Sequence, residues 1–145
     1  ATSPNGGMGL FAVRPDGRGD VSASHLAWEC SKNVPSRSSL ILVGERLFMV
    51  SDTGVISCLD AKSGGSVWQQ RVEGAFSASP LFAEGRIYFF GEDGEITVIA
   101  AEDEFKLLAN NRLGDGFIAS PAVYESSLIL RSRSHLYRLE MTRSR

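Results

Sequence analysis

The stretch Ser39-Leu-Ile-Leu-Val-Gly-Glu-Arg-Leu-Phe-Met-Val-Ser-Asp-Thr-Gly54 recurs as Pro80-Leu-Phe-Ala-Glu-Gly-Arg-Ile-Tyr-Phe-Phe-Gly-Glu-Asp-Gly94, with one residue fewer. A third copy follows as Pro121-Ala-Val-Tyr-Glu-Ser-Ser-Leu-Ile-Leu-Arg-Ser-Arg-Ser-His135. Equivalent residues lie 40 or 41 positions apart: Trp28 and Trp68, Arg46 and Arg86, Gly54 and Gly94, Pro80 and Pro121. A fixed period of this length indicates a repeat architecture.

Each repeat is expected to contain four short strands, because β-branched and aromatic residues gather in short runs bounded by turn residues. The first full copy predicts strands at 40–43, 46–51, 55–60 and 66–72. Gly54 and Gly94 end equivalent hairpin loops, where a positive φ is needed. The segment 100–110 is interpreted as strand, loop and strand, because it aligns with the third and fourth strands of the first copy.

A repeat of about 40 residues with four antiparallel strands is the blade of a β-propeller. The predicted fold class is therefore all-β, a partial propeller of three to four blades. Residues 1–8 are expected to be a flexible N-terminal segment and 9–145 to hold the repeats. The expected divisions are a partial blade at 9–33, blades at 34–74 and 75–116, and a partial blade at 117–140.

Composition excludes several classes of protein. The chain has 145 residues, of which 43% are hydrophobic and 22% charged, with a formal net charge of -2. Disordered chains are less hydrophobic and more strongly charged. No apolar run approaches the roughly 20 residues of a membrane span, and no basic stripe indicates nucleic acid. No signal peptide is visible in this chain.

The segment Cys58-Leu-Asp-Ala-Lys-Ser-Gly-Gly-Ser-Val-Trp68 resembles the tryptophan-docking motif of the quinoprotein dehydrogenase propellers, A-x-D-x-x-T-G-x-x-x-W, with Cys for Ala and Ser for Thr. The resemblance implies that the tryptophan packs between neighbouring blades. It implies that Asp60, Ser63 and Gly64 hold the turn between the third and fourth strands. Trp28 recurs in the partial first blade, whereas alignment puts Leu108 at the tryptophan place of the second copy.

From residue 10 to residue 140 the chain resembles the C-terminal portion of the PQQ-like (pyrroloquinoline quinone-like) repeat propellers of bacteria such as planctomycetes. The resemblance implies an exported, periplasmic parent protein. Complete members close a ring with more blades, so this chain is expected to be a fragment or a partial propeller that assembles with others. Its open ends predict self-association or contact with the remaining blades, for example a dimer in which residues 26–30 complete the last blade of a second copy.

No catalytic, cofactor-binding or metal-binding residue is expected. A quinone site needs an acidic base and usually calcium with several oxygen ligands. The candidate carboxylates are assigned elsewhere: Asp60 to the docking turn, Glu92 and Asp93 to a hairpin, and 102–104 to a solvated loop. His25 and His135 show no Ser or Cys partner at a recognisable spacing, and Ser77, Ser79 and Ser120 recur with the repeat as structural residues. Cys30 and Cys58 are expected to be buried free thiols, with a disulfide between them as the alternative in an oxidising compartment.

These observations predict a non-catalytic scaffold for binding or protein assembly, with a protein as its partner. Rigid blades would bury their faces on one another and leave loops free for recognition. The alternative is part of a PQQ-dependent dehydrogenase that oxidises alcohols or sugars. That alternative would bring PQQ and Ca²⁺ as cofactors.

Overall fold

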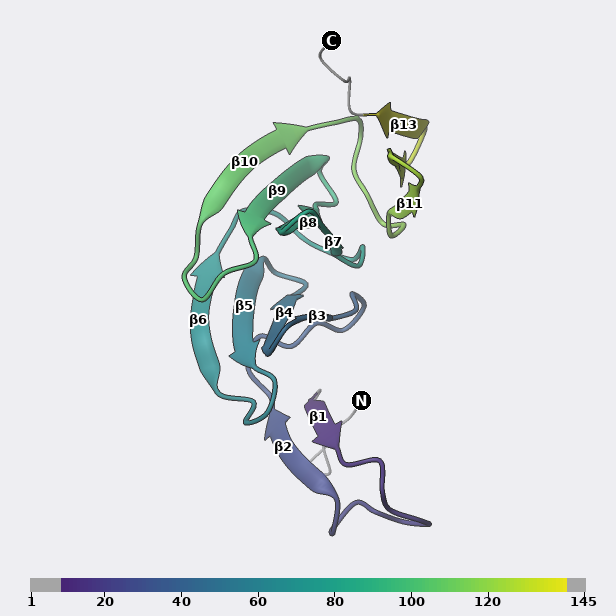
Figure 1. Ribbon diagram of the computed structural model, residues 1–145. Helices are drawn as coiled ribbons and strands as arrows, with labels where there is room; N and C mark the ends of the chain where they lie inside the picture. Colours follow the sequence, from purple (N-terminus) through teal and green to yellow (C-terminus); the bar gives the residue numbers. More distant parts are fainter. Residues whose placement is uncertain (1–8, 141–145) are drawn as a thin grey trace.

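A computed structural model describes residues 9–140, which form four antiparallel β-sheets placed one after another along an arc (Figure 1). The first sheet has two strands, the second and third have four each, and the last has three. The strands are β1 (Leu10–Val13), β2 (Leu26–Cys30), β3 (Ile41–Val43), β4 (Arg46–Val50), β5 (Val55–Asp60), β6 (Ser66–Arg71), β7 (Leu81–Ala83), β8 (Arg86–Phe90), β9 (Glu95–Ala100), β10 (Leu107–Arg112), β11 (Ala122–Tyr124), β12 (Ser127–Arg131) and β13 (Leu136–Glu140). The predicted all-β fold class is confirmed. The expectation for residues 1–8 lies outside the described residues.

Each sheet is a meander in which strands consecutive in sequence are neighbours in space. The short strands β3, β7 and β11 lie on the inner side of the arc, and β2, β6 and β10 lie on its outer side (Figure 1). A two-residue loop joins each inner strand to the next strand, and its first residue has a positive φ: 59° at Gly44, 50° at Glu84 and 53° at Glu125. The loop therefore keeps its backbone conformation where glutamate, at Glu84 and Glu125, takes the place of Gly44.

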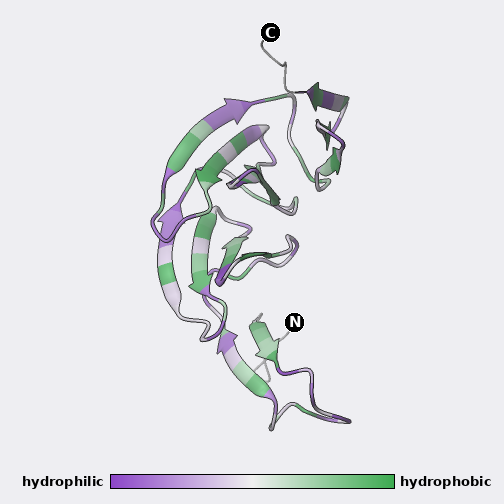
Figure 2. Ribbon diagram, in the orientation of Figure 1, coloured by the Kyte–Doolittle hydropathy of each residue, from purple (hydrophilic) through white to green (hydrophobic). Residues whose placement is uncertain are grey.

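The core lies between the sheets. Phe48, Cys58, Ile87 and Phe89 belong to one buried cluster between the second and third sheets, and Phe90, Phe117 and Leu130 belong to another between the third and fourth. Figure 2 shows the hydrophobic residues concentrated on the central strands such as β5 and β9. Strands buried on both faces are expected to be apolar throughout rather than alternating. This explains why β5 and β9 are almost continuously apolar.

The inner edge of the arc carries a hydrogen-bonded row of serines. The backbone N–H of Ser39 donates to Ser79 Oγ at 3.0 Å, and the N–H of Ser79 donates to Ser120 Oγ at 3.0 Å. These serines precede β3, β7 and β11. One serine per sheet thus joins neighbouring sheets at their innermost point.

The two cysteines differ in burial. Cys58 is fully buried, but Cys30 is only half-buried, so the prediction of two buried thiols is wrong for Cys30. Cys30 lies at the end of β2, in a two-stranded sheet too small to cover it.

Across residues 9–140 the structure contains no helix with the length and apolarity of a membrane span.

Candidate functional site

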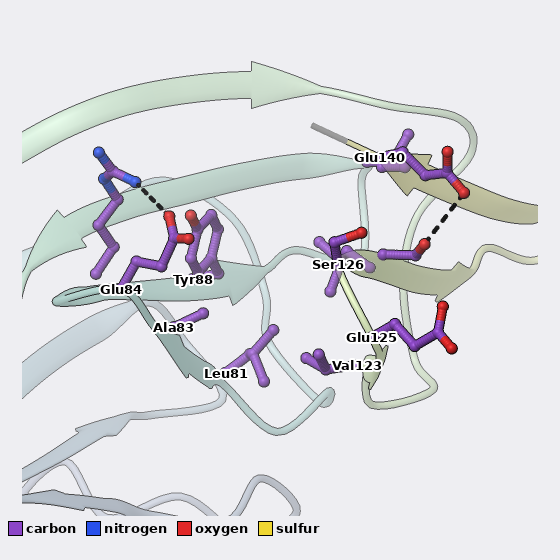
Figure 3. A pocket seen from close by; sticks show the side chains of 12 residues that line it. Leu81, Ala83, Glu84, Tyr88, Val123, Glu125, Ser126 and Glu140 are labelled. Carbon is purple, nitrogen blue, oxygen red and sulfur yellow. Dashed lines mark hydrogen bonds and ion pairs between the residues drawn. The ribbon is translucent and has the colours of Figure 1, made fainter. Parts of the chain in front are cut away.

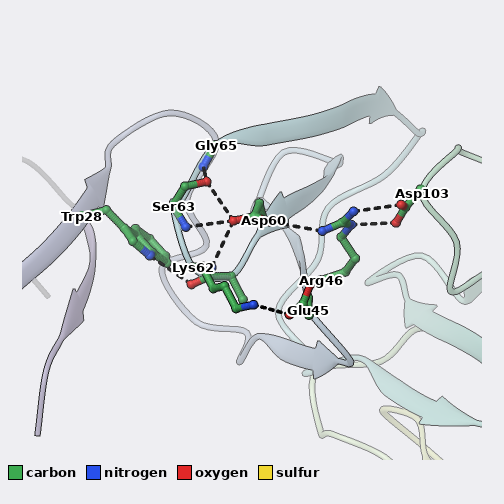
Figure 4. Close-up of polar contacts among 9 residues, drawn as sticks. Trp28, Glu45, Arg46, Asp60, Lys62, Ser63, Gly65 and Asp103 are labelled. Atoms are coloured by element: carbon green, nitrogen blue, oxygen red, sulfur yellow. Dashed lines mark hydrogen bonds and ion pairs between the residues drawn. The ribbon is translucent and has the colours of Figure 1, made fainter.

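The turn after β5 is organised by one carboxylate. Asp60 Oδ1 accepts hydrogen bonds from the N–H and Oγ of Ser63 at 2.9 and 2.8 Å, and from the N–H of Lys62 at 3.2 Å (Figure 4). Ser63 Oγ in turn accepts from the N–H of Gly65 at 3.2 Å. The hydrogen bonds from Ser63 lower the pKa of Asp60 below its ordinary value, because they favour the charged form. The carboxylate is thus committed to the turn.

Trp28 lies on this turn. Its indole Nε1 donates to the carbonyl oxygen of Ala61 at 3.1 Å, and its ring covers Gly64. A Cβ at Gly64 would lie 2.5 Å from the Trp28 ring, and the φ of Gly64 is 72°. Both conditions favour glycine, because other residues avoid this φ and real Cβ atoms do not approach so closely.

Trp68 occupies the equivalent place one sheet later. Its ring centroid is 6.0 Å from that of Phe48 and 5.4 Å from that of Phe105, which it meets edge to face at 73°. Its Nε1 donates to the carbonyl oxygen of Glu102 at 3.3 Å. The turn 101–106, between β9 and β10, therefore closes the gap between the second and third sheets.

Arg46 forms ion pairs with Asp103 of the turn 101–106 and with Asp60. Its Nε and Nη2 donate to the two carboxylate oxygens of Asp103 at 2.6 and 2.8 Å, and its Nη1 donates to Asp60 Oδ2 at 3.1 Å (Figure 4). Such a bidentate pair is directional as well as ionic. It lowers the pKa of Asp103, and the hydrogen bond to Asp103 raises that of Arg46. Sequence analysis noted the repetition of the arginine but missed this partner, which is 57 positions away.

The third sheet departs from this arrangement at the tryptophan place. Strand pairing sets Trp68 opposite Cys58, and it sets Ala109 opposite Val98. The alignment of Leu108 with Trp68 is therefore wrong, and Ala109 is the equivalent residue. The cause is the turn before β10, residues 101–106, which is one residue longer than the turn 61–65 before β6; both strand pairs carry the same irregularity in register. Leu108 is exposed.

A pocket of about 370 Å³ lies between the third and fourth sheets (Figure 3). Arg86 and Tyr88 line one wall at the places that Arg46 and Phe48 occupy in the preceding gap. The opposite wall comes from β11, β12, β13 and their hairpin, and the full lining is Leu81, Ala83, Glu84, Arg86, Tyr88, Val123, Glu125, Ser126, Ser127, Leu128, Leu139 and Glu140. Sequence reasoning missed this pocket.

The remaining candidate residues are locally hydrogen-bonded. Each histidine meets the serine just before it in sequence: Ser24 Oγ is 2.7 Å from His25 Nδ1, and Ser134 Oγ is 2.6 Å from His135 Nδ1. Both contacts join adjacent residues, a local spacing that the sequence analysis did not consider. Asp16 lies 3.6 Å from His25 Nε2, beyond hydrogen-bond distance. These exposed pairs of adjacent residues are not arranged as a nucleophile with its oriented base.

Carboxylates and other ligand side chains are scattered rather than clustered. Among residues 9–140, no three or more His, Cys, Asp or Glu side chains gather where they could hold a metal ion. Calcium takes 6–8 oxygen ligands. The described residues therefore do not fit, by themselves, the calcium that a quinone site usually needs.

Four-stranded sheets repeated along an arc, with tryptophans docked on the turn of the next sheet, define the class of the protein as a β-propeller of PQQ-like repeats. The chain belongs to the family described as outer membrane protein assembly factor BamB, whose family model matches residues 12–106. That match covers the Asp60 turn and both tryptophans.

Similar proteins include BamB and quinoprotein dehydrogenases. The outer membrane protein assembly factor BamB of Pseudomonas aeruginosa is 26% identical over 102 residues, and the polyvinylalcohol dehydrogenase of a Sphingopyxis species is 31% identical over 64 residues. These matches cover 70% and 44% of the chain, but only 26% and 10% of the relatives. The chain thus spans a small part of each relative's length.

Solved structures agree on the fold. The crystal structure of BamB from Moraxella catarrhalis matches 83% of this chain and 38% of its own, with 25% sequence identity and a TM-score of 0.66. A europium-containing methanol dehydrogenase matches 72% of this chain and 21% of its own, with 14% identity and a TM-score of 0.56. The latter likeness concerns the fold alone.

Proposed function

We propose that this chain is part of a non-catalytic, BamB-like propeller that serves as a binding scaffold in the assembly of outer membrane proteins. The family match over residues 12–106 carries the proposal, because the model is that of an assembly factor. The location that follows is the periplasm, at the outer membrane.

The chemistry of the docking turns supports a structural role for the most polar part of the chain. Asp60 is held by Ser63 and Arg46, and Asp103 by Arg46. Asp60 is ion-paired and hydrogen-bonded within its own sheet, and Asp103 is ion-paired across two sheets, so both carboxylates are engaged in structural contacts. In this proposal the scaffold presents its surfaces to proteins and holds no quinone of its own.

A chimera tests the assembly role. The matched segment of the Pseudomonas aeruginosa BamB would be replaced by residues of this chain, and outer membrane protein levels would be measured in cells lacking their own BamB. A second chimera, with the matched segment of the polyvinylalcohol dehydrogenase, controls for the fold. The proposal expects restoration by the first chimera alone. Equal failure of both, at equal expression, would overturn it.

The second candidate is part of a quinone-dependent dehydrogenase of alcohols or sugars, favoured by the 31% identity to the polyvinylalcohol dehydrogenase. Adding PQQ and Ca²⁺ to the purified chain separates the two functions. The scaffold proposal expects no change in quinone absorbance and no dye reduction with alcohols. Dye reduction dependent on PQQ would support the dehydrogenase instead.

The proposal extends to the ends of the arc. Among the described residues, the last sheet ends with β13 and has three strands, and the first sheet consists of β1 and β2 alone, whereas the two middle sheets have four strands each. Unpaired edges favour association with further strands, so we expect the chain to self-associate or to join the remaining blades. Light scattering that returned a monomer at micromolar concentration would contradict self-association.

A further inference from the structure

A second hollow lies between the two middle sheets, on the side of their outer strands. Its volume is about 260 Å³, and its walls are the end of β6 with the residues that follow it, and the starts of β9 and β10. The end of β6 and the start of β10 lie side by side on the outer side of the arc (Figure 1). Both sheets have four strands among the described residues, so two sheets of the full repeat bound this hollow.

Part of the surface of the hollow is apolar. Val72 and Phe105 are half-buried and pack against the buried cluster between the second and third sheets. Leu107, at the start of β10, is 49% exposed. Trp68 contacts Phe105 from within the gap between the sheets. A ligand in the hollow would therefore meet apolar surface that continues into the core.

The polar part of the lining offers hydrogen-bond acceptors and negative charge. Glu73 is exposed and Glu95 is half-buried, and neither forms an ion pair in the part of the chain that the structure describes. Arg71 also lines the hollow, but its Nη1 donates to the carbonyl oxygen of Thr53 at 3.1 Å. Gln70 Nε2 donates to the carbonyl oxygen of Arg71 at 3.1 Å, which leaves Oε1 as an acceptor. A cation with several donors therefore complements this lining.

Glu95 departs from the repeat. Strand pairing sets it opposite the last residue of β10, as it sets Val55 opposite the last residue of β6, so the two positions are equivalent. Val55 is buried, at 9% exposure. The residue opposite Glu95 is Arg112, whose Nη2 donates to the carbonyl oxygen of Asp93 at 3.1 Å instead. A half-buried carboxylate without a partner costs stability, so packing alone favours valine at this position.

We propose that this hollow binds an arginine side chain presented by a partner protein. The apolar stem of the arginine would lie over Leu107 and Phe105, and its guanidinium would bind the carboxylates of Glu73 and Glu95. Arginine suits the lining better than lysine, because a guanidinium has five donors in a plane and stacks on aromatic rings. This inference rests on the proposed scaffold function and names the chemistry of one partner residue.

The probe is the capped tripeptide acetyl-Gly-Arg-Gly-amide. One counterpart carries citrulline, the neutral isostere of arginine, and another carries lysine. Proton–nitrogen NMR spectra of the 145-residue chain are recorded at low salt as each peptide is added. The arginine peptide is expected to give saturable shifts at about 1 mM, and the amide groups that shift most should be those of Gln70, Glu95, Leu107 and Asn110. Citrulline should weaken binding about tenfold, because it removes the charge from the hydrogen bonds, and lysine should weaken it about threefold.

Substitutions on the protein give the matching test. Glu95→Val introduces the residue that the second sheet has at the equivalent position. It should weaken binding of the arginine peptide about tenfold and raise the urea midpoint of unfolding, so that lost binding is not lost folding. Glu95→Gln, which keeps the size and polarity of the side chain, should weaken binding to a similar extent and serves as the test if valine impairs folding.

Glu29→Gln is the matched control. Glu29 is exposed on the outer strand β2 of the first sheet, and it has no ion pair within residues 9–140. Its substitution removes the same charge away from the hollow. Binding of the arginine peptide should therefore change less than about twofold.

The inference is overturned by an absence of saturable shifts at about 10 mM arginine peptide, by equal binding of the citrulline peptide, or by unchanged binding after both substitutions of Glu95. Equal binding of the lysine peptide would overturn the choice of arginine. None of these results touches the chimera experiment. If the chimera restores outer membrane proteins while the peptide does not bind, the scaffold function stands and the arginine site falls. If the peptide binds while the chimera fails, the reverse holds.

Discussion

The contact between Trp28 and Gly64 allows a quantitative prediction, because Gly44 and Gly64 in the second sheet share a left-handed backbone conformation but differ in the space around a Cβ. Gly44 and Gly64 both have a left-handed φ, 59° and 72°. A Cβ at Gly44 would meet nothing within 4 Å, whereas a Cβ at Gly64 would lie 2.5 Å from the Trp28 ring. Alanine at Gly44 thus measures the backbone cost alone, and alanine at Gly64 measures that cost plus a steric clash.

The expected magnitudes follow from these two contributions. Holding a residue with a Cβ in the left-handed region costs about 1 kcal/mol, so Gly44→Ala should lower the free energy of unfolding by about that amount. Forcing the Trp28 ring to move adds about 1–3 kcal/mol, so Gly64→Ala should cost about 2–4 kcal/mol in total. In a Trp28→Ala background the clash is absent, and Gly64→Ala should cost only about 1 kcal/mol.

Urea unfolding followed by far-ultraviolet circular dichroism measures the unaltered chain, the three single variants and the double variant. The midpoint should fall more for Gly64→Ala than for Gly44→Ala, with similar slopes. The coupling free energy between the substitutions at Trp28 and Gly64 should be about 1–3 kcal/mol. If Gly64→Ala cost no more than Gly44→Ala, or if the coupling were zero, the docking of Trp28 on the turn would be refuted.

Three further outcomes are expected. Trp68→Ala should lower the free energy of unfolding by about 3 kcal/mol, because it removes the packing between sheets; Trp68→Phe, which keeps a ring but loses the hydrogen bond to Glu102, should cost about 1 kcal/mol in the same urea assay. Burial raises the pKa of Cys58 to about 11, so a thiol reagent at neutral pH should label Cys30 first and Cys58 only on unfolding. Because the folded pKa of Cys58 is above its unfolded value near 9.0, its contribution to stability is present below pH 9 and is lost as pH rises through 11. Hydrogen bonds from Ser132 and Ser134 lower the pKa of Asp115 to about 2; its contribution is present above pH 3.8 and is lost as pH falls toward 2, and Asp115→Asn should flatten that part of the acid unfolding curve.

The repeat made much of the fold predictable. Spacings of 40 and 41 residues locate the strands, and the four strands expected between 40 and 72 correspond to β3, β4, β5 and β6 to within a residue at each end. The resemblance around Asp60 also pointed to the turn on which Trp28 lies. These features are local or periodic, and a sequence displays both.

Other features depend on contacts that a sequence does not display. The turn between β9 and β10 is one residue longer than the turn between β5 and β6, which moved the tryptophan place from Leu108 to Ala109, and a fixed spacing of 40 does not reveal where the extra residue lies. The pairing of Arg46 with Asp103 joins residues in different sheets. The pocket beside Arg86 is lined by residues of two sheets, and no residue pattern marks it.

The serine row on the inner edge has a consequence for how such chains grow. Ser79 accepts from the preceding sheet through its hydroxyl and donates to the following sheet through its N–H, so one residue carries both halves of the joint. A duplicated unit of about 40 residues would bring its own donor and acceptor, and would connect to both neighbours without compensating substitutions elsewhere. Duplication or deletion of one unit can therefore lengthen or shorten this arc one sheet at a time, and the number of units is free to differ between relatives that share the same joint.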